Sequence, residues 1–304
     1  MLRSKHIAGN RDGVAGAVAT IFILLIVLSF INIYIGAYVP SYMRTQEYNH
    51  MQDVYQQFST FQLQNYNLES GHWQYPLATT FVMGSQGEAP FATPTNGQIM
   101  FSRSSFSVSI SLNYSLNISG STTPIRQYDS AGGSLALFVQ NRYFTPQTVT
   151  YQGGAVIVTQ NGVSFISSGP QFKALYSGGT TKTATVALNM ISLLGNNFSL
   201  SGSGPASLST SYFSNRSVYL TPPNGTTLNV TINTQLPMAL AWEKYLSSSL
   251  SQFRNVTGLG SLYQKAGAYS LTLNLKGNTA YLNITIYKIT SLHLRLGVMQ
   301  TSGS

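Results

Sequence analysis

Side chains that can carry acid–base or metal chemistry are few and widely spaced in this chain of 304 residues. There is no cysteine, which excludes disulfides, zinc–thiolate sites and thiol catalysis. Past residue 44 the histidines are His50, His72 and His293, and none lies at metal-ligand spacing from another histidine or a carboxylate. The carboxylates there are far apart in the sequence: Glu47, Asp53, Glu69, Glu88, Asp129 and Glu243. Because neither a nucleophile elbow nor a glycine-rich phosphate loop occurs, we expect no catalytic residue, no metal site and no cofactor.

Asparagines in N-glycosylation acceptor sequences are the chemically distinctive residues of this chain. The pattern N-x-S/T occurs at Asn113, Asn117, Asn197, Asn215, Asn224, Asn229, Asn255 and Asn283. Several of them fall on the polar positions of alternating strands, as Asn229 does between Leu228 and Val230. A glycan requires a solvent-facing asparagine outside the cytoplasm, so the pattern predicts a glycosylated domain on the cell surface.

The charge balance argues against nucleic acid as a partner. Lys and Arg outnumber Asp and Glu by 16 to 7, which gives a formal net charge of +9. The basic residues are scattered, however, and form no stripe interleaved with aromatic residues. Only 8% of the residues are charged, but 19 Tyr and 15 Phe supply enough apolar surface for a folded core.

A long apolar segment near the N-terminus determines how the domain is presented. Residues 13–43 contain no charged side chain. About 20 apolar residues in a helix cross a bilayer core of about 30 Å, and a lone span must be helical, so we predict a transmembrane helix over residues 14–39. The basic residues Arg3, Lys5 and Arg11 place residues 1–13 in the cytoplasm as a leader. This predicts a single-pass protein of the cell membrane, with the lipid bilayer as a partner and the C-terminal domain extracellular.

The helix is expected to continue beyond the membrane as a stalk over residues 40–66. Tyr48, Met51, Tyr55 and Phe58 recur at helical spacing and form one apolar stripe. This stripe can contact neighbouring subunits, or it can pack against the protein's own domain. The sequence alone favours the second arrangement.

Residues 67–304 are expected to form a mainly β, antiparallel sandwich-like domain with one packed helix. In residues 106–119 apolar and polar residues alternate strictly, which predicts a strand with one buried face. Further strands are predicted at residues 134–139, 148–160, 163–167 and 183–194, and around Val230. Pro237 and the apolar positions after it predict the helix. Gly277–Asn278 predicts a two-residue turn that joins strands 269–275 and 282–286 in a hairpin. The pair Gly153–Gly154 is expected to be a turn rather than a phosphate cradle.

The N-terminal residues resemble those of archaeal type IV pilin-like proteins. RDG at residues 11–13 is followed at once by VAGAV at residues 14–18 and by the apolar helix. In that family a prepilin peptidase removes a short basic leader that ends in Gly. The resemblance therefore implies cleavage between Gly13 and Val14, with a prepilin-peptidase-like enzyme as a processing partner. The Glu common at the fifth mature position of bacterial pilins is absent, and Val18 stands there.

Three other stretches resemble a group of uncharacterised archaeal membrane-anchored surface proteins. They are residues 39–58 (VPSYMRTQEYNHMQDVYQQF), residues 151–171 (YQGGAVIVTQNGVSFISSGPQ) and the late helix around Trp242 and Tyr245. Known members of that group are mostly acidic, whereas this chain is basic. A partner that is contacted through surface charge is therefore not implied.

Three functional hypotheses follow from the sequence. The first is a non-catalytic, pilin-like surface protein with a structural or adhesive role, anchored or assembled through its N-terminal helix with copies of itself or other pilin-like subunits. The second is a membrane-anchored module that binds a ligand or carbohydrate. The third, an envelope hydrolase, requires a convergent cluster of carboxylates or histidines that the sequence does not predict.

Overall fold

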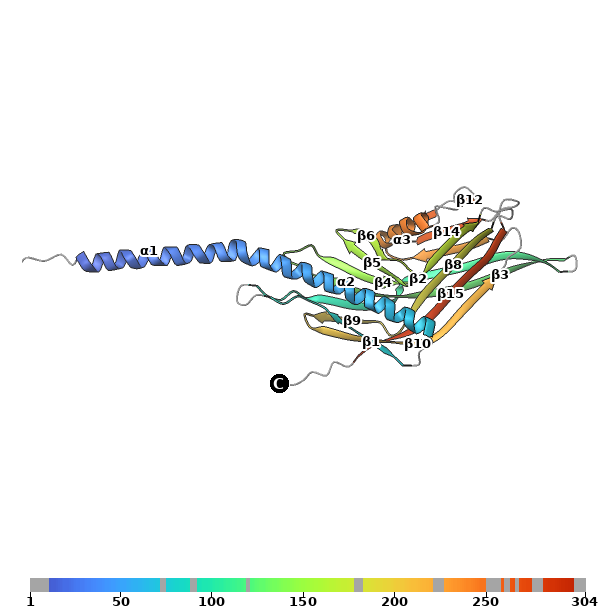
Figure 1. Ribbon diagram of the computed structural model, residues 1–304, viewed down its shortest axis with the longest axis horizontal. Coiled ribbons are helices and arrows are strands. Elements are labelled where there is room, and N and C mark those ends of the chain that lie inside the picture. Colours follow the sequence, from blue (N-terminus) through green and yellow to red (C-terminus); the bar gives the residue numbers. More distant parts are fainter. Residues whose placement is uncertain are drawn as a thin grey trace, which may run out of the picture.

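The computed structural model describes residues 11–71, 75–87, 92–118, 121–177, 183–220, 227–249, 258–259, 263–265, 268–274 and 281–297. A long helical segment projects from one end of the molecule and continues into a β-rich domain (Figure 1). Within the described residues, the domain consists of two sheets and one further helix, α3 (Leu236–Ser249). The mainly β composition and the single packed helix agree with the sequence analysis.

The helical segment is continuous through a proline. It comprises α1 (Arg11–Ile33), the π-helical segment η1 (Tyr34–Tyr38) and α2 (Val39–Gly71). Pro40 has no N–H to donate to the carbonyl one turn earlier, and its ring crowds that carbonyl. The wider π turn, in which the N–H of Val39 donates to the carbonyl of Tyr34, accommodates the proline without ending the helix.

The smaller sheet has five strands in the order β1-β10-β15-β8-β7. Their bounds are β1 (Leu77–Val82), β7 (Phe172–Ser177), β8 (Thr183–Leu194), β10 (Pro205–Leu220) and β15 (Tyr281–Leu296). The pair β8–β15 is parallel, and the other pairs in this sheet are antiparallel. The sequence predicts antiparallel pairing throughout, so this pair is an exception. No short hairpin connects β8 to β15, which lies near the C-terminus, so their direction is not set by a tight turn and the two strands can run parallel.

The larger sheet has ten strands. Its main path, β12-β14-β11-β2-β3-β4-β5-β6, is joined by β13 on β14 and β9 on β2. The bounds are β2 (Gly97–Ile118), β3 (Ser121–Val139), β4 (Gln147–Gln152), β5 (Ala155–Gln160), β6 (Val163–Ser168), β9 (Phe198–Gly202), β11 (Thr227–Asn233), β12 (Gly258–Leu259), β13 (Tyr263–Lys265) and β14 (Ala268–Asn274). Helix α3 packs mainly on β6 at the end of this path.

The alternation expected over residues 106–119 is confirmed for its described side chains. Phe106, Val108 and Ile110 in β2 are fully buried, whereas Ser107 and Ser109 are partly exposed. The turn expected at Gly153–Gly154 is also confirmed. Both glycines have positive φ angles, 61° and 91°, and they join β4 to β5 as a hairpin.

The hairpin expected around Gly277–Asn278 is wrong. Strand β14 pairs with β11, β12 and β13 in the larger sheet, while β15 pairs with β10 and β8 in the smaller one. The two turn residues lie outside the described residues. Apolar alternation specifies which face of a strand is buried but not which strand lies beside it, so consecutive strands can separate into different sheets.

Helix α2 contributes to the core shared by both sheets. It contacts β1 and β10 of the smaller sheet and β4 and β5 of the larger one. Phe58 and Phe61 are fully buried and meet Phe81 of β1 edge to face, with ring centroids 5.0 and 5.7 Å apart. Phe61 also contacts Tyr151 of β4 at 5.0 Å. Such aromatic contacts add to the burial of about 150–250 Å² per ring.

Candidate anchoring and assembly helix

Helix α1 presents apolar side chains on every side and packs against no other described element. In Figure 1 it projects away from the β domain, and α2 is the part of the helical segment that lies along the domain. The large apolar side chains between Val18 and Ile35 are each 43–69% exposed. Among the described residues this is the one helix that is long and apolar enough to cross a membrane. Residues 14–38 have a helical rise of about 37 Å, slightly more than a hydrocarbon core of about 30 Å.

The few polar side chains of α1 are satisfied within the helix itself. The hydroxyl of Thr20 donates to the carbonyl of Gly16 at 2.9 Å, and the hydroxyl of Ser29 donates to that of Leu25 at 2.7 Å. A hydroxyl that bonds to its own helix can enter an apolar environment at little cost. Burying each large apolar side chain contributes about 1.5–3 kcal/mol, so covering this helix contributes on the order of 20 kcal/mol. That exceeds the whole stability of a typical domain, about 5–15 kcal/mol, so a lipid or protein cover is strongly favoured.

Three tyrosines form a ladder where the apolar segment ends. Tyr34, Tyr38 and Tyr42 follow one another at one-turn spacing, and successive ring centroids lie 5.0 and 6.1 Å apart in stacked arrangements. Arg44 is the first charged residue after them. Tyrosine is enriched at the membrane–water boundary because its ring is apolar and its hydroxyl is polar. The ladder therefore lies where a spanning helix would meet the lipid headgroups.

A buried carboxylate fixes the helix to the β domain directly after this boundary. Glu47 is fully buried, and its two oxygens accept backbone N–H groups of Arg142, Tyr143 and Phe144 at 3.0, 2.7 and 2.6 Å. These donors belong to the loop between β3 and β4. Hydrogen bonds to a carboxylate are stronger than those between neutral groups, so this contact holds the loop against the helix.

His50 lies one turn further along and is almost fully buried. Its Nε2–H donates to the carbonyl of Val82 at 2.9 Å, and its Nδ1 is buried without a hydrogen-bond partner. Burial lowers the pKa of His50 below the ordinary value of 6.5. The hydrogen bond to Val82 and the charges of Asp53 and Glu47 oppose this effect only partly.

The residues of the expected apolar stripe lie on the side of α2 that faces the domain. Met51 and Phe58 are fully buried in the core. Tyr55 is half-buried and its hydroxyl donates to Oε1 of Gln147, while Tyr48 is half-exposed with its ring 5.7 Å from that of Phe144. These contacts correspond to the alternative in which the stripe packs on its own domain.

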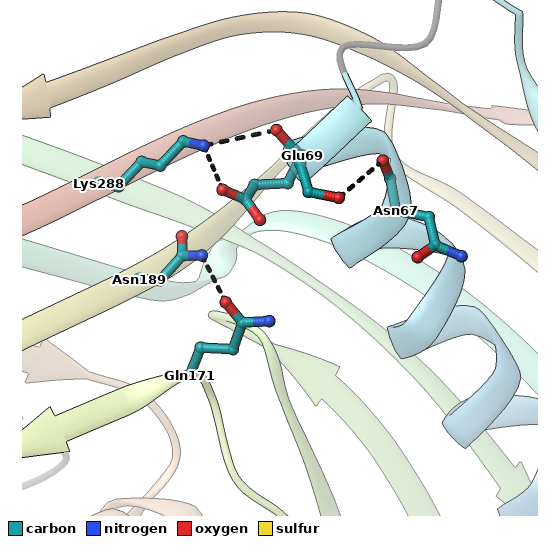
Figure 2. A network of polar contacts seen from close by, with 6 residues as sticks. Asn67, Glu69, Gln171, Asn189 and Lys288 are labelled. Atoms are coloured by element: carbon teal, nitrogen blue, oxygen red, sulfur yellow. Dashed lines mark hydrogen bonds and ion pairs between the residues drawn. The ribbon is translucent and has the colours of Figure 1, made fainter.

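The far end of α2 is held by an ion pair, shown in Figure 2. The ammonium group of Lys288 on β15 pairs with the carboxylate of Glu69, and it also donates to the Glu69 carbonyl at 3.4 Å. Close by, the side-chain amide of Asn189 on β8 donates to that of Gln171 at 3.0 Å. Helix α2 continues to Gly71, beyond residue 66, where the predicted stalk ends. The ion pair of Glu69 and the fully buried side chain of Leu68 both stabilise this last turn against the domain.

A polar cluster between these two ends joins the later part of α2 to the stretch 151–171 and to the late helix. The amide of Gln62 donates to the carbonyls of Gly154 and Gly169 at 2.7 and 3.1 Å. The hydroxyl of Tyr66 donates to Gly154 at 3.0 Å, and burial raises the pKa of Tyr66 to about 12. From α3, the hydroxyl of Tyr245 donates to the carbonyl of Pro170 at 3.2 Å. The stretch 151–171 thus lies between α2 and the late helix.

The other expected site residues lie apart from this helix–domain contact. Gly13 and Val14 lie in the first turn of α1. Asn197 and Asn215 are exposed, in the β8–β9 loop and in β10. Asn113 and Asn117 lie in β2, Asn229 in β11 and Asn283 in β15. At these four residues the structure describes the backbone alone. Asn224 and Asn255 lie outside the described residues.

The three buried carboxylates of the described domain all have structural partners. Besides Glu47 and Glu69, the carboxylate of Asp129 pairs with Arg216 at 2.8 Å. Within the part of the chain that the structure describes, no three His, Asp or Glu side chains gather as a metal site would require. In the sequence these carboxylates are isolated residues. Their partners are distant in sequence and are brought to them by the fold.

Comparisons with protein-family models, with curated proteins and with solved structures each give no match. The resemblance to pilin-like proteins therefore rests on the residues of the N-terminal segment alone.

Proposed function

We propose that this protein is a non-catalytic, pilin-like component of the cell surface with a structural or adhesive role. Its N-terminal helix anchors it in the membrane or assembles it with copies of itself or with other pilin-like subunits. In this proposal residues 1–13 are a cytoplasmic leader, and a sandwich-like, glycosylated β domain is extracellular. A prepilin-peptidase-like enzyme cleaves between Gly13 and Val14 when the protein is assembled.

One observation carries the proposal: a single helix that is exposed and apolar in α1 and buried in the domain core in α2. The fixed contacts of Glu47 and Glu69 couple the two parts, so a force on α1 passes directly into both sheets. Anchoring and assembly are two ways of covering the same apolar surface, one with lipid and the other with neighbouring helices.

The experiment that tests this is N-terminal sequencing and intact-mass measurement of the native protein. Membrane and sheared surface fractions are analysed separately. An N-terminus at Val14 in the sheared fraction supports assembly, and an intact leader found only in membranes supports permanent anchoring. Recovery of the protein from the soluble cytoplasm would refute both.

A pair of glycine variants makes the processing step specific. Gly13→Leu should block cleavage, because the resemblance places the peptidase signal at that residue. Gly16→Leu, three residues on in a position with open space around it, should leave cleavage intact. Equal processing of the two variants would contradict cleavage after Gly13.

A second candidate function, a membrane-anchored module that binds a carbohydrate or another ligand, is favoured by one observation. A pocket of about 620 Å³ lies where the two sheets meet, which is within the size range of small-molecule sites. The two candidates are compatible, since an anchored or assembled subunit can also bind a ligand.

A further inference from the structure

The pocket is formed by segments that are far apart in the sequence. Its walls come from the ends of β8 and β15, from the β8–β9 loop, from the start of β9 and from β2. The lining residues are Arg103, Leu194, Gly195, Asn196, Asn197, Phe198, His293, Leu294, Arg295 and Leu296. They include two guanidinium groups and an imidazole but no carboxylate.

Local backbone features place the first of the two arginines. The pairing of β2 with β3 shifts register between Ser102 and Ser107, so Arg103 lies in a bulge. Bulges redirect a side chain out of the regular alternation of a strand. The N–H of Arg103 donates to Oδ1 of Asn197 at 3.0 Å, which fixes the bulge against the β8–β9 loop.

The remaining walls combine apolar and amide groups. The ring of Phe198 is half-buried beside Phe101, with centroids 6.0 Å apart. Phe213 meets the imidazole of His293 edge to face at 4.5 Å and so restricts its orientation. A side chain at Gly195 would lie 2.6 Å from the carbonyl of Leu294, so the absence of a side chain there lets the loop approach β15 closely.

This combination matches one class of ligand. Guanidinium groups pair with carboxylate or sulfate oxygens, and two of them in a pocket without carboxylates favour an anion. Aromatic and aliphatic walls suit the C–H faces of a sugar ring, and amides can bond its hydroxyls. The pocket is also larger than a free sulfate or phosphate ion would need.

We propose that this pocket binds an acidic sugar, with its carboxylate or sulfate at Arg103 and Arg295 and its ring against Phe198 and His293. The inference rests on the second candidate function and is independent of how the N-terminal helix is covered.

The test is calorimetric titration of the full chain in phosphatidylcholine nanodiscs. The protein is produced in a host without N-glycosylation, because a glycan on Asn197 would stand at the pocket and compete. The titrants are trigalacturonate, glucose and inorganic sulfate. Arg103→Gln and Arg295→Gln are compared with Arg126→Gln, an exposed arginine on β3 that does not line the pocket.

Trigalacturonate should bind to the wild type and to Arg126→Gln with equal affinity. Each pocket variant should bind about tenfold more weakly or worse, since a charge-assisted hydrogen bond is lost. Thermal unfolding of each variant shows whether the fold is retained. If a pocket variant unfolds, competition of trigalacturonate with sulfate on the wild type, followed through the imidazole NMR signals of His293, locates the site instead.

Three results would overturn the inference. Glucose binding as tightly as trigalacturonate, without dependence on the arginines, would leave a carbohydrate-binding module but not this site. Sulfate binding as tightly as trigalacturonate would reduce the site to a simple anion site. Failure of every titrant to bind would remove the second candidate function as well, whereas membrane anchoring would be untouched.

Discussion

At the scale of single residues, a domain with few charged side chains uses its carboxylates as structural acceptors. Glu47 illustrates the consequence, because three backbone N–H groups depend on its two oxygens. A buried N–H group without an acceptor costs about 1–3 kcal/mol. The carboxylate therefore determines the position of a whole loop.

Glu47→Gln should destabilise the protein by about 2–4 kcal/mol, because an amide NH₂ replaces one acceptor oxygen and faces the loop donors. Amide hydrogen exchange should accelerate at residues 142–144 before it does elsewhere. The matched control is Asp53→Asn, on the exposed side of the same helix, which should change stability by less than about 0.5 kcal/mol. Equal effects of the two substitutions would show that the loop does not depend on Glu47.

His50 should make stability depend on pH. Burial lowers its pKa in the folded protein below 6.5, so the unfolded chain takes up a proton at a higher pH than the folded chain does. The free energy of unfolding is therefore highest above about pH 6.5 and decreases as the pH falls from there to the folded-state pKa. His50→Gln retains a donor for the Val82 carbonyl but does not titrate. The melting temperature, measured at a series of pH values, should depend less on pH for this variant than for the wild type. An unchanged pH dependence would contradict a role for His50.

At the scale of elements, two glycines in hairpin turns separate backbone strain from steric contact. Gly154 and Gly162 both have positive φ, 91° and 75°. A side chain at Gly162 meets nothing within 4 Å, whereas one at Gly154 would lie 2.9 Å from the Tyr66 hydroxyl. Gly162→Ala should cost about 1–2 kcal/mol from strain alone. Gly154→Ala should cost distinctly more, because it also displaces Tyr66 from the polar cluster. Chemical denaturation measures both, and equal losses would exclude the contact with Tyr66.

Strand β2 offers a test of its two faces at adjacent positions. Ile110 is fully buried and Ser109 is partly exposed. Ile110→Asp places an unpaired carboxylate in the core and should cost several kcal/mol, enough to unfold a marginal domain. Ser109→Asp adds the same charge on the other face and should preserve cooperative unfolding in a thermal melt. Tolerance of both substitutions would mean that the strand has no buried face.

The sequence predicted the elements better than their neighbours. Alternation in residues 106–110 and the glycine pair at 153–154 depend on a few adjacent residues, so local chemistry specified them. The pairing of β14 and β15 in different sheets depends on strands that are distant in sequence. The local pattern around Gly277–Asn278 therefore predicted a hairpin that does not form. The Glu47 contact joins residues 95 to 97 positions apart. The pocket depends on a bulge and a loop that no local pattern indicates.

At the scale of the whole molecule, one helix belongs to two environments. Among the described residues its first part is exposed along its length, while its second part packs between the two sheets. A free stalk could be removed without consequence, but a core element could not. Residues 40–66 are therefore better described as a central helix of the domain that extends directly into the apolar segment.

Two truncations distinguish these descriptions. Removal of residues 1–38 should yield a protein that is soluble without detergent and unfolds cooperatively, because the buried residues of α2 from Val39 onward are retained. Removal of residues 1–71 should give an aggregating chain, since it deletes six fully buried apolar side chains, Met43, Met51, Val54, Phe58, Phe61 and Leu68. Each large core side chain lost costs about 2–5 kcal/mol, so their joint loss exceeds the stability of a typical domain. Gel filtration and thermal melts provide the comparison. A well-folded product of the longer truncation would show that α2 is a detachable stalk, and aggregation of the shorter one would show that the domain depends on the apolar segment itself.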